Sequence, residues 1–227
     1  MSLTLHHHPL ASFCWKVVLA LEEKQLAYDS VIVNLGDAQP RADHLALWPI
    51  GKMPVLVDAA RGRTIAETSI IVEYLEDHHP GALPLLPGDA DTRLDVRLWD
   101  RVFDLYVQVP MQKFVSDFLR PADGKDPVGL ADARTMLATA YTMLDAHLAD
   151  RRWATGEAFS MADCAAAPGL FYANIVQPFA ADHPNLAAYF ERLVERASFR
   201  HVIAEAQPYF EFYPFNADIP ARFRTAV

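Results

Sequence analysis

The sequence predicts an α+β protein with two domains, a small α/β unit followed by an all-helical unit. Strand and helix patterns alternate over residues 1–79 as βαβ and then ββα. Proline and glycine concentrate over residues 80–90, as in a linker. Residues 91–227 then show only long stretches of helical periodicity. A chain of 227 residues is long enough for each unit to have its own core.

The N-terminal unit begins with a strand pattern from Leu3 to His8, a loop and a helix. Ser12 is a natural N-cap for that helix, because its hydroxyl can accept a backbone N–H. Cys14 lies in the first turn, where the helix dipole lowers the pKa of a thiol. A cysteine there can also face the core as a small apolar side chain, and we favour this structural interpretation.

Residues 48–76 predict a hairpin followed directly by a helix. Met53 to Val57 is a short apolar run, Arg61 to Gly62 marks a turn, and Arg63 to Ala66 resumes the extended pattern. The apolar period becomes helical from Thr68 to Glu76, with no Gly or Pro to interrupt it.

Two features of this hairpin and helix suit them to bind an extended peptide. Pro54 begins the first strand and cannot donate a ladder hydrogen bond, so the Met53 backbone stays open to a ligand. Glu67 and Thr68 mark the junction of strand and helix, where free backbone N–H groups attract a carboxylate, and Glu67 can hold an ammonium group. Each feature also has a structural explanation, since Pro54 can simply start a strand and Thr68 can simply cap its helix. Their combination favours ligand binding.

These residues resemble the glutathione transferase superfamily, in particular cytosolic bacterial members of the Ser/Cys type. The resemblance lies in GKMPVL at residues 51–56 and ETSIIVEYL at 67–75, and it extends to residues 3–23 and 159–168. It implies a thioredoxin-like, glutathione-binding domain over residues 1–79. It also implies that the helical bundle after the linker lines the pocket for a second substrate.

The resemblance also implies how glutathione is held. The Met53 backbone would pair with the cysteinyl part, Glu67 and Thr68 would hold the γ-glutamyl end, and Gln39 or Arg41 would reach the glycyl end. The last two lie in a polar loop that can equally be only solvated. The glutathione-binding residues implied are Met53, Pro54, Glu67, Thr68, Lys52, Gln39 and Arg41.

The catalytic loop departs from the family pattern. Relatives place a Ser, Cys or Tyr near the glutathione sulfur, whereas this chain has Ala11 at the position of the usual serine. Ser12, one position on, can supply the hydroxyl if the loop is shifted, and backbone N–H groups of the same helix can share that role. A reactive Cys14 would instead favour thiol–disulfide exchange.

A long amphipathic stretch over residues 91–119 predicts the first helix of the C-terminal unit. Leu94, Leu98 and Val102 form one stripe, which we expect to pack inside, and Pro110 should kink the helix. In the family this helix helps to line the pocket for the electrophile. The candidate pocket residues are Phe103, Tyr106 and Pro110, with Trp99 and Phe114 as further candidates.

Farther along, Ser160 and Asp163 have the spacing of a capping box that starts a helix, and Phe159 precedes them as a hydrophobic staple. The residues that follow are apolar on nearly every side, which is typical of a buried central helix. We therefore expect Asp163 to act in folding.

Charge and composition argue against several classes of protein. The formal net charge of −9 disfavours nucleic-acid binding. No apolar run approaches a membrane span and no signal-peptide pattern begins the chain, so we expect a cytoplasmic protein without membrane contact. The cysteines, Cys14 and Cys164, do not indicate a disulfide framework. We expect no metal, because His6 to His8 would alternate between the two faces of a strand.

The leading functional hypothesis is a glutathione S-transferase that ionises the glutathione thiol and transfers it to a small electrophile. The alternatives are a glutathione-dependent thiol reductase or isomerase and a non-catalytic glutathione-binding or interaction protein, which Ala11 supports. By resemblance we expect a homodimer, with contact zones from Ile70 to His79 and from Arg93 to Arg101.

Overall fold

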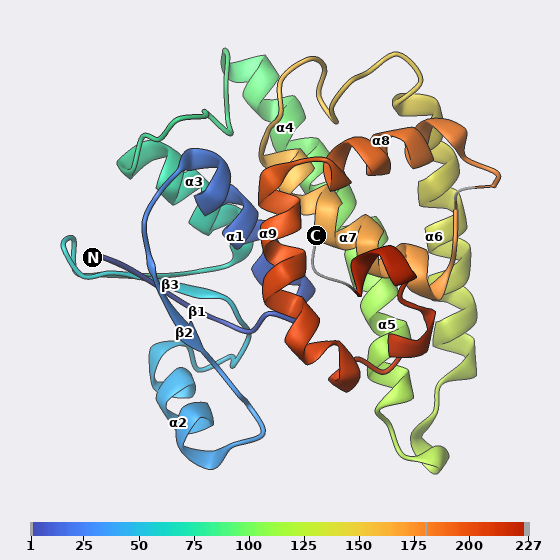
Figure 1. Ribbon diagram of the computed structural model, residues 1–227, viewed down its shortest axis with the longest axis horizontal. Helices are drawn as coiled ribbons and strands as arrows, with labels where there is room; N and C mark the ends of the chain where they lie inside the picture. Colours follow the sequence, from blue (N-terminus) through green and yellow to red (C-terminus); the bar gives the residue numbers. More distant parts are fainter. Residues whose placement is uncertain (1, 180, 225–227) are drawn as a thin grey trace.

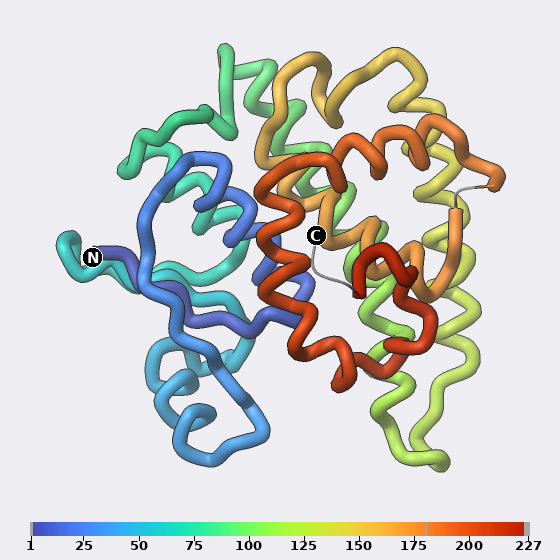
Figure 2. Tube along the Cα trace, in the orientation of Figure 1, coloured from blue at the N-terminus to red at the C-terminus, as the bar shows by residue number. Residues whose placement is uncertain are grey.

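A computed structural model describes residues 2–179 and 181–224 of the chain. Figure 1 shows two units side by side, one that contains the sheet and one built of helices. The tube in Figure 2 shows that the N-terminal third of the chain forms the first unit and the remainder forms the second. This arrangement confirms the predicted α+β fold with an α/β unit followed by a helical unit.

The sheet of the N-terminal unit has the order β2-β1-β3-β4. Its central strands, β1 (Leu3–His7) and β3 (Val55–Asp58), run antiparallel. Strand β2 (Asp29–Ile32) is parallel to β1 at one edge, and β4 (Arg63–Ala66) is antiparallel to β3 at the other. The apolar run after Pro54 therefore forms the inner strand of the predicted hairpin, with both faces buried at Val55 and Leu56.

Helices cover both faces of this sheet. Helices α1 (Ser12–Lys24) and α3 (Thr68–His78) lie on one side, and α2 (Ala38–Leu47) lies on the other (Figure 1). Helix α1 is buried along most of its length, since residues such as Val17 and Leu21 are fully covered. Its central position carries the loop before it to the boundary between the two units.

The helical unit begins with α4 (Ala90–Val102), a π-helical segment η1 (Phe103–Gln108) and α5 (Val109–Phe118). It continues through α6 (Pro127–His147), α7 (Met161–Val176), α8 (Pro184–Val194) and α9 (Ala197–Ala206). Short 3-10 turns follow α5 and occur along the C-terminal tail; they are η2 (Ala122–Gly124), η3 (Gln207–Phe212), η4 (Asn216–Asp218) and η5 (Ala221–Phe223). No helix in the described parts of the chain is long and apolar enough to cross a membrane.

Helix α7 is the buried centre of this unit, as the sequence predicts. The capping box is confirmed, because the side chain of Ser160 and the side chain of Asp163 each bond the backbone of the other residue. Asp163 is fully buried and also accepts hydrogen bonds from the Ala154 N–H at 2.8 Å and the Tyr189 hydroxyl at 2.7 Å.

The expectation that Leu94, Leu98 and Val102 form one stripe that packs inside was wrong for the two leucines. Leu94 and Leu98 point to solvent, with 63% and 54% of their surface exposed, while Val96 and Val102 are buried. The helix also changes register ahead of Pro110, where the Val109 N–H bonds the Asp104 carbonyl five residues back. A π-helical turn thus accommodates the proline, whose ring and missing N–H disturb an ordinary α-helical turn.

The C-terminal tail packs back over the molecule. Phe210 and Phe223 stack on or against Phe171 of α7, and the ring of Tyr209 lies 5.1 Å from that of His8, at the end of the first strand. The tail therefore joins the surface of α7 to the N-terminal unit, a role that the sequence did not indicate.

Candidate functional site

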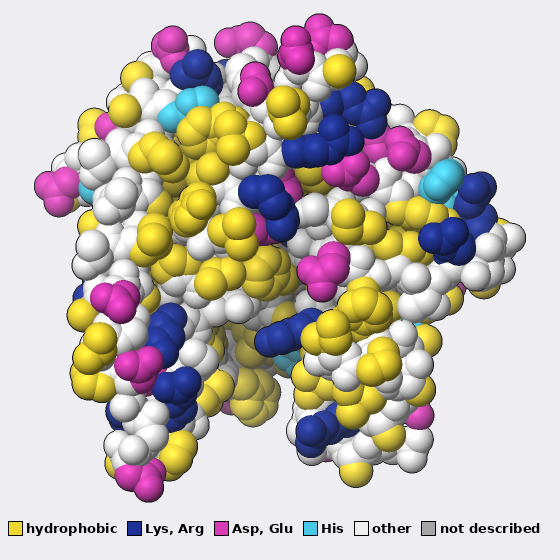
Figure 3. All heavy atoms as spheres, turned by 180° about the vertical axis from the view of Figure 1, so that it is seen from behind, with side chains coloured by type: hydrophobic (Ala, Val, Ile, Leu, Met, Phe, Trp, Pro, Cys, Tyr) yellow, Lys and Arg dark blue, Asp and Glu magenta, His cyan; other side chains and the backbone are white. Residues whose placement is uncertain are grey.

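A cavity of about 1070 Å³ lies between the two units. The N-terminal unit contributes the start of α1, the segment before β3 and the start of α3, while the helical unit contributes α4, η1 and α5. Figure 3 shows the molecule from behind, where hydrophobic side chains gather around charged ones and a deep notch separates two lobes. The predicted residues Lys52, Met53, Pro54, Glu67 and Thr68 all line this single cavity.

The segment before β3 forms one wall. The peptide bond between Met53 and Pro54 is cis. The ring of His44, which is buried in α2, donates from Nε2 to the Lys52 carbonyl at 3.0 Å and so fixes the segment from behind. Trp48 lines the same wall, and its indole N–H has no partner among the described residues.

The start of α3 forms the next wall. The N-cap is Glu67, with a positive φ of 67°, and Thr68 is the first helical residue, so the alternative explanation that Thr68 simply caps its helix does not hold. Residues other than Gly rarely adopt this backbone region, which is over-represented at ligand sites. No side chain in the described structure caps α3, and its first N–H groups thus face the cavity beside the Glu67 carboxylate.

A buried cluster of charges lies beneath the cavity, where α1 meets α4 and η1. Lys16 is fully buried and pairs with Asp100 at 2.5 Å and with Asp104 at 2.7 Å. It also donates to the Ser69 hydroxyl at 2.9 Å, and Arg101 contacts both carboxylates and that hydroxyl. Burial raises the pKa of Asp104, against the effect of the Lys16 charge. The cluster connects the start of α3 to the helical unit.

The loop before α1 is held by the helical unit and by α1 itself. The Tyr172 hydroxyl donates to the Leu10 carbonyl at 3.1 Å, and the Trp15 indole donates to the Pro9 carbonyl at 2.5 Å. Ala11 is the N-cap of α1 and lines the cavity. The position of the usual family serine therefore faces the ligand space with a methyl group.

Ser12 has a different position from the one expected. It is the first helical residue, is 5% exposed and does not line the cavity, while Ala11 and Phe13 on either side do. Its hydroxyl does not cap α1; it accepts a hydrogen bond from Gln112 Nε2 at 3.3 Å. The prediction of a capping Ser12 was therefore wrong.

Cys14 is completely buried and points away from the cavity lining. Burial raises the pKa of its thiol to about 12, opposite in direction to the shift that a reactive thiolate requires. Cys14 thus behaves as a small apolar residue of the core, as we favoured from the sequence.

Other predicted site residues lie elsewhere. Gln39 and Arg41 belong to α2 and not to a loop, and they do not line the cavity; the Gln39 amide donates to Asp43 on the helix surface. Phe103 is fully buried and stacks near Tyr189, so its assignment to the pocket was wrong. Tyr106 is 44% exposed and Pro110 is buried, and neither lines the cavity.

The sequence reasoning missed several lining residues. The wall from the helical unit is formed by residues of α4, η1 and α5, and they are Arg97, Asp100, Arg101, Asp104, Leu105, Val109 and Gln112. Trp48, at the start of the segment from 48 to 76, and Ser69, directly after Thr68, also line the cavity; their place beside the predicted ligand-binding residues was the signal for them.

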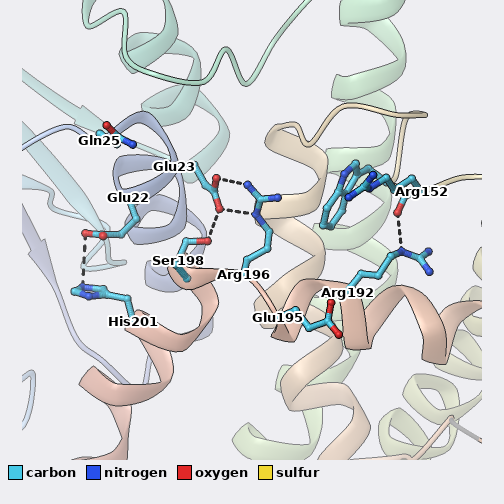
Figure 4. Close-up of a pocket in the computed structure, with 11 residues that line it drawn as sticks. Glu22, Glu23, Gln25, Arg152, Arg192, Glu195, Arg196, Ser198 and His201 are labelled. Carbon is cyan, nitrogen blue, oxygen red and sulfur yellow. Dashed lines mark hydrogen bonds and ion pairs between the residues drawn. The ribbon is translucent and has the colours of Figure 1, made fainter. Parts of the chain in front are cut away.

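A second hollow of about 690 Å³ lies behind the C-terminal half of α1 (Figure 4). It contains ion pairs between the units. The Arg196 guanidinium bonds both oxygens of Glu23, and the Ser198 hydroxyl bonds the same carboxylate. His201 of α9 lies 3.7 Å from Glu22 of α1. These contacts join the two units.

No group of three or more His, Cys, Asp or Glu side chains in the described residues has the arrangement of a metal site. The cavity instead contains a backbone edge, a helix start, one free carboxylate and an apolar wall. This combination suits an extended peptide that carries both an ammonium group and a carboxylate.

Comparisons with known proteins agree with this geometry. Residues 5–83 match the glutathione S-transferase N-terminal domain, and residues 127–192 match the C-terminal domain of the same family. FtsZ-localized protein A of Caulobacter vibrioides is 30% identical over 217 residues, which cover 90% of this chain and 92% of that protein. The chain belongs to the glutathione S-transferase family.

Two further similar proteins are themselves named glutathione S-transferases. Glutathione S-transferase GstB of Escherichia coli K12 is 26% identical over 190 residues, with 83% of this chain and 91% of GstB covered. The structure of a glutathione S-transferase from Methylobacillus flagellatus, solved with GSH bound, matches with a TM-score of 0.80 and 30% identity. The match covers 88% of this chain and 98% of that structure's chain.

Proposed function

We propose that this family member binds glutathione in the cavity between its units, stabilises the thiolate and transfers it to a small electrophilic molecule. The observation that carries the proposal is the convergence of the Met53 segment and the helix start at Glu67 and Thr68 on one cavity. The match to a family structure solved with GSH bound supports the choice of ligand.

In this proposal the ligand lies along the N-terminal wall. The Met53 backbone pairs with the cysteinyl residue, while Glu67 binds the γ-glutamyl ammonium and the first N–H groups of α3 bind the neighbouring carboxylate. Lys52, which lines the cavity, binds the glycyl carboxylate. Lys52 thus takes the role that the sequence had suggested for Gln39 or Arg41.

The opposite wall would hold the electrophile. Phe13, Leu105 and Val109 give it an apolar surface next to Ala11, where the sulfur would lie. The thiol releases its proton to solvent, and the thiolate donates an electron pair to the electrophilic carbon. A new S–C bond forms, and the carbon either accepts the displaced π electrons or loses a leaving group with its bonding pair.

A second candidate function is glutathione binding without turnover. Ala11 favours it, since this side chain cannot hydrogen-bond the sulfur. The relative from Caulobacter vibrioides is named for its localisation with FtsZ and not for an enzyme activity. A thiol reductase that uses Cys14 is less well supported, because the pKa of this buried thiol is raised. The pKa of bound glutathione separates the first two candidates.

Calorimetric titration of glutathione tests the proposal. The wild-type chain should bind, and Glu67→Ala should bind at least about tenfold more weakly, because a charge-assisted hydrogen bond contributes roughly 1.5 kcal/mol or more. Glu157→Ala removes an exposed carboxylate that does not line the cavity and should leave the affinity unchanged. Absence of binding by the wild-type chain would rule out the proposal.

We also propose that the protein is a homodimer. Ile70 on α3 and Leu94 and Leu98 on α4 are exposed by 54% or more and lie in the contact zones suggested by the family resemblance. Exposed apolar residues that share one face are typical of interfaces between subunits.

A further inference from the structure

The proposed function leaves one requirement of the chemistry without a side chain. A thiolate near neutral pH needs a hydrogen-bond donor, and the cavity presents a methyl group at Ala11. Ser12 is turned away from the cavity and Cys14 is buried with a raised pKa. The loop that carries the donor in relatives therefore offers only backbone N–H groups.

We infer that Gln112, on α5 of the helical unit, is the catalytic residue whose side-chain amide donates a hydrogen bond to the glutathione thiolate. This inference rests on the proposed function. Gln112 lines the same cavity as Ala11 and Met53. Its Nε2 atom lies 3.3 Å from the hydroxyl of Ser12, the residue next to Ala11, so the amide reaches the loop where the sulfur would lie.

The amide has the capacity for this second bond. An amide nitrogen carries two N–H groups, of which one is directed at Ser12, and the other remains available to the cavity. The bond to Ser12 holds the amide against the loop, with Nε2 as the amide atom that lies 3.3 Å from the Ser12 hydroxyl. Gln112 thus resembles a donor held in place before the ligand arrives.

The other polar side chains on this wall are already engaged. Arg97 donates twice to Glu73, both at 2.8 Å. Asp100, Arg101 and Asp104 belong to the cluster around Lys16. Among the described residues of the helical unit that line the cavity, Gln112 is the neutral donor outside these ion pairs.

A neutral amide suits the chemistry. Its N–H bonds the charged sulfur more strongly than the protonated thiol, and this difference lowers the thiol pKa, while the released proton passes to solvent. A lysine or arginine at the same place would also attract the thiolate but would reduce its nucleophilicity further. The N–H groups at the start of α1 can assist, since no side chain in the described structure caps this helix.

The test follows the ultraviolet absorbance of the bound glutathione thiolate as a function of pH. In Gln112→Leu the pKa of the bound thiol should rise by about one, because a hydrogen bond to a charged group contributes about 1.4 kcal/mol or more. Gln177→Leu is the matched control: its amide donates to the Arg134 carbonyl and does not line the cavity. The control should keep the wild-type pKa.

A rescue variant separates the donor role from a loss of packing. In the double variant Ala11→Ser with Gln112→Leu, the added hydroxyl should restore a lowered thiol pKa. An unchanged pKa in Gln112→Leu would overturn the inference while leaving the proposed function intact. If the thiol pKa is unchanged in Gln112→Leu but rises by about one in Ser12→Ala, the donor is Ser12 and the inference is overturned. Absence of glutathione binding, or an ordinary thiol pKa, in the wild-type chain would overturn both this inference and the proposed transfer function.

Discussion

Asp163 shows how a single buried carboxylate can organise a helix start. It accepts hydrogen bonds from the Ala154 and Ser160 N–H groups, both at 2.8 Å, and from the Ser160 and Tyr189 hydroxyls. Burial raises its pKa, and these four donors act in the opposite direction by stabilising the charged form. A carboxylate at this position is an acceptor only, so all of its neighbours are donors.

Asp163→Asn should therefore destabilise the protein strongly. The new amide NH₂ is a donor and would be placed against groups that are also donors. We therefore expect a loss of about 3 kcal/mol in the free energy of unfolding. Thermal unfolding followed by circular dichroism should show a midpoint lower by roughly 6 to 12 °C. Asp132→Asn, at an exposed position on α6, should leave the midpoint within about 2 °C of the wild-type value. Equal midpoints for both variants would contradict this role.

Residues whose function depends on neighbours in the sequence could be predicted. Ser160 and Asp163 form their capping box over three positions, and Met53 and Pro54 act through the backbone of one strand. The orientation of Ser12 could not be predicted, because it depends on Gln112, one hundred residues away in the sequence.

At the scale of elements, the sequence indicated the helices but not the sides that they present. The period of α4 placed Leu94 and Leu98 on an apolar stripe, and such a stripe can face a core or a partner subunit. The pocket residues implied by the resemblance lie in or next to the π-helical segment, which the sequence did not indicate, and Phe103, Tyr106 and Pro110 do not line the cavity. The polar segment that holds Gln39 and Arg41 was predicted as a loop, whereas it forms the first turn of α2, where a proline such as Pro40 is tolerated.

The contact between α1 and α9 should depend on pH. His201 lies 3.4 Å from Glu205 and 3.7 Å from Glu22, and its pKa is raised, chiefly by its interaction with Glu205. A raised pKa means that the protonated ring stabilises the folded state fully below about pH 6.5, the ordinary histidine value, and that this contribution disappears as the pH rises through the folded-state pKa.

His201→Gln should accordingly lower the free energy of unfolding in mildly acidic buffer but not in alkaline buffer. The ring is 40% exposed, so the difference at low pH should stay below about 1 kcal/mol. Urea unfolding at a series of pH values gives the free energy of unfolding of both proteins. The difference between wild type and variant separates the effect of His201 from the effects of the other histidines. A difference that grows toward alkaline pH would be the wrong sign for this explanation.

At the scale of the whole molecule, the proposed homodimer gives the exposed face of α3 and α4 a partner. Sedimentation equilibrium should give the mass of two chains for the wild-type protein. Leu98→Lys should shift the mass toward one chain, since it places a charge in an apolar interface. Val128→Lys changes a residue that is 71% exposed on α6, outside the contact zones, and should leave the dimer intact. A wild-type mass of one chain would rule out the dimer.

The charge cluster around Lys16 has a consequence for how the two units are aligned. Its cation comes from α1 and its carboxylates, Asp100 and Asp104, come from the helical unit. An apolar surface would permit small sliding motions, but a displacement that separated Lys16 from both carboxylates would leave a buried lysine without a counter-ion, at a cost of about 3 to 5 kcal/mol. The cluster thus fixes the position of one unit relative to the other. It thereby sets the distance between the strand that would hold the peptide and the helix that would approach its sulfur.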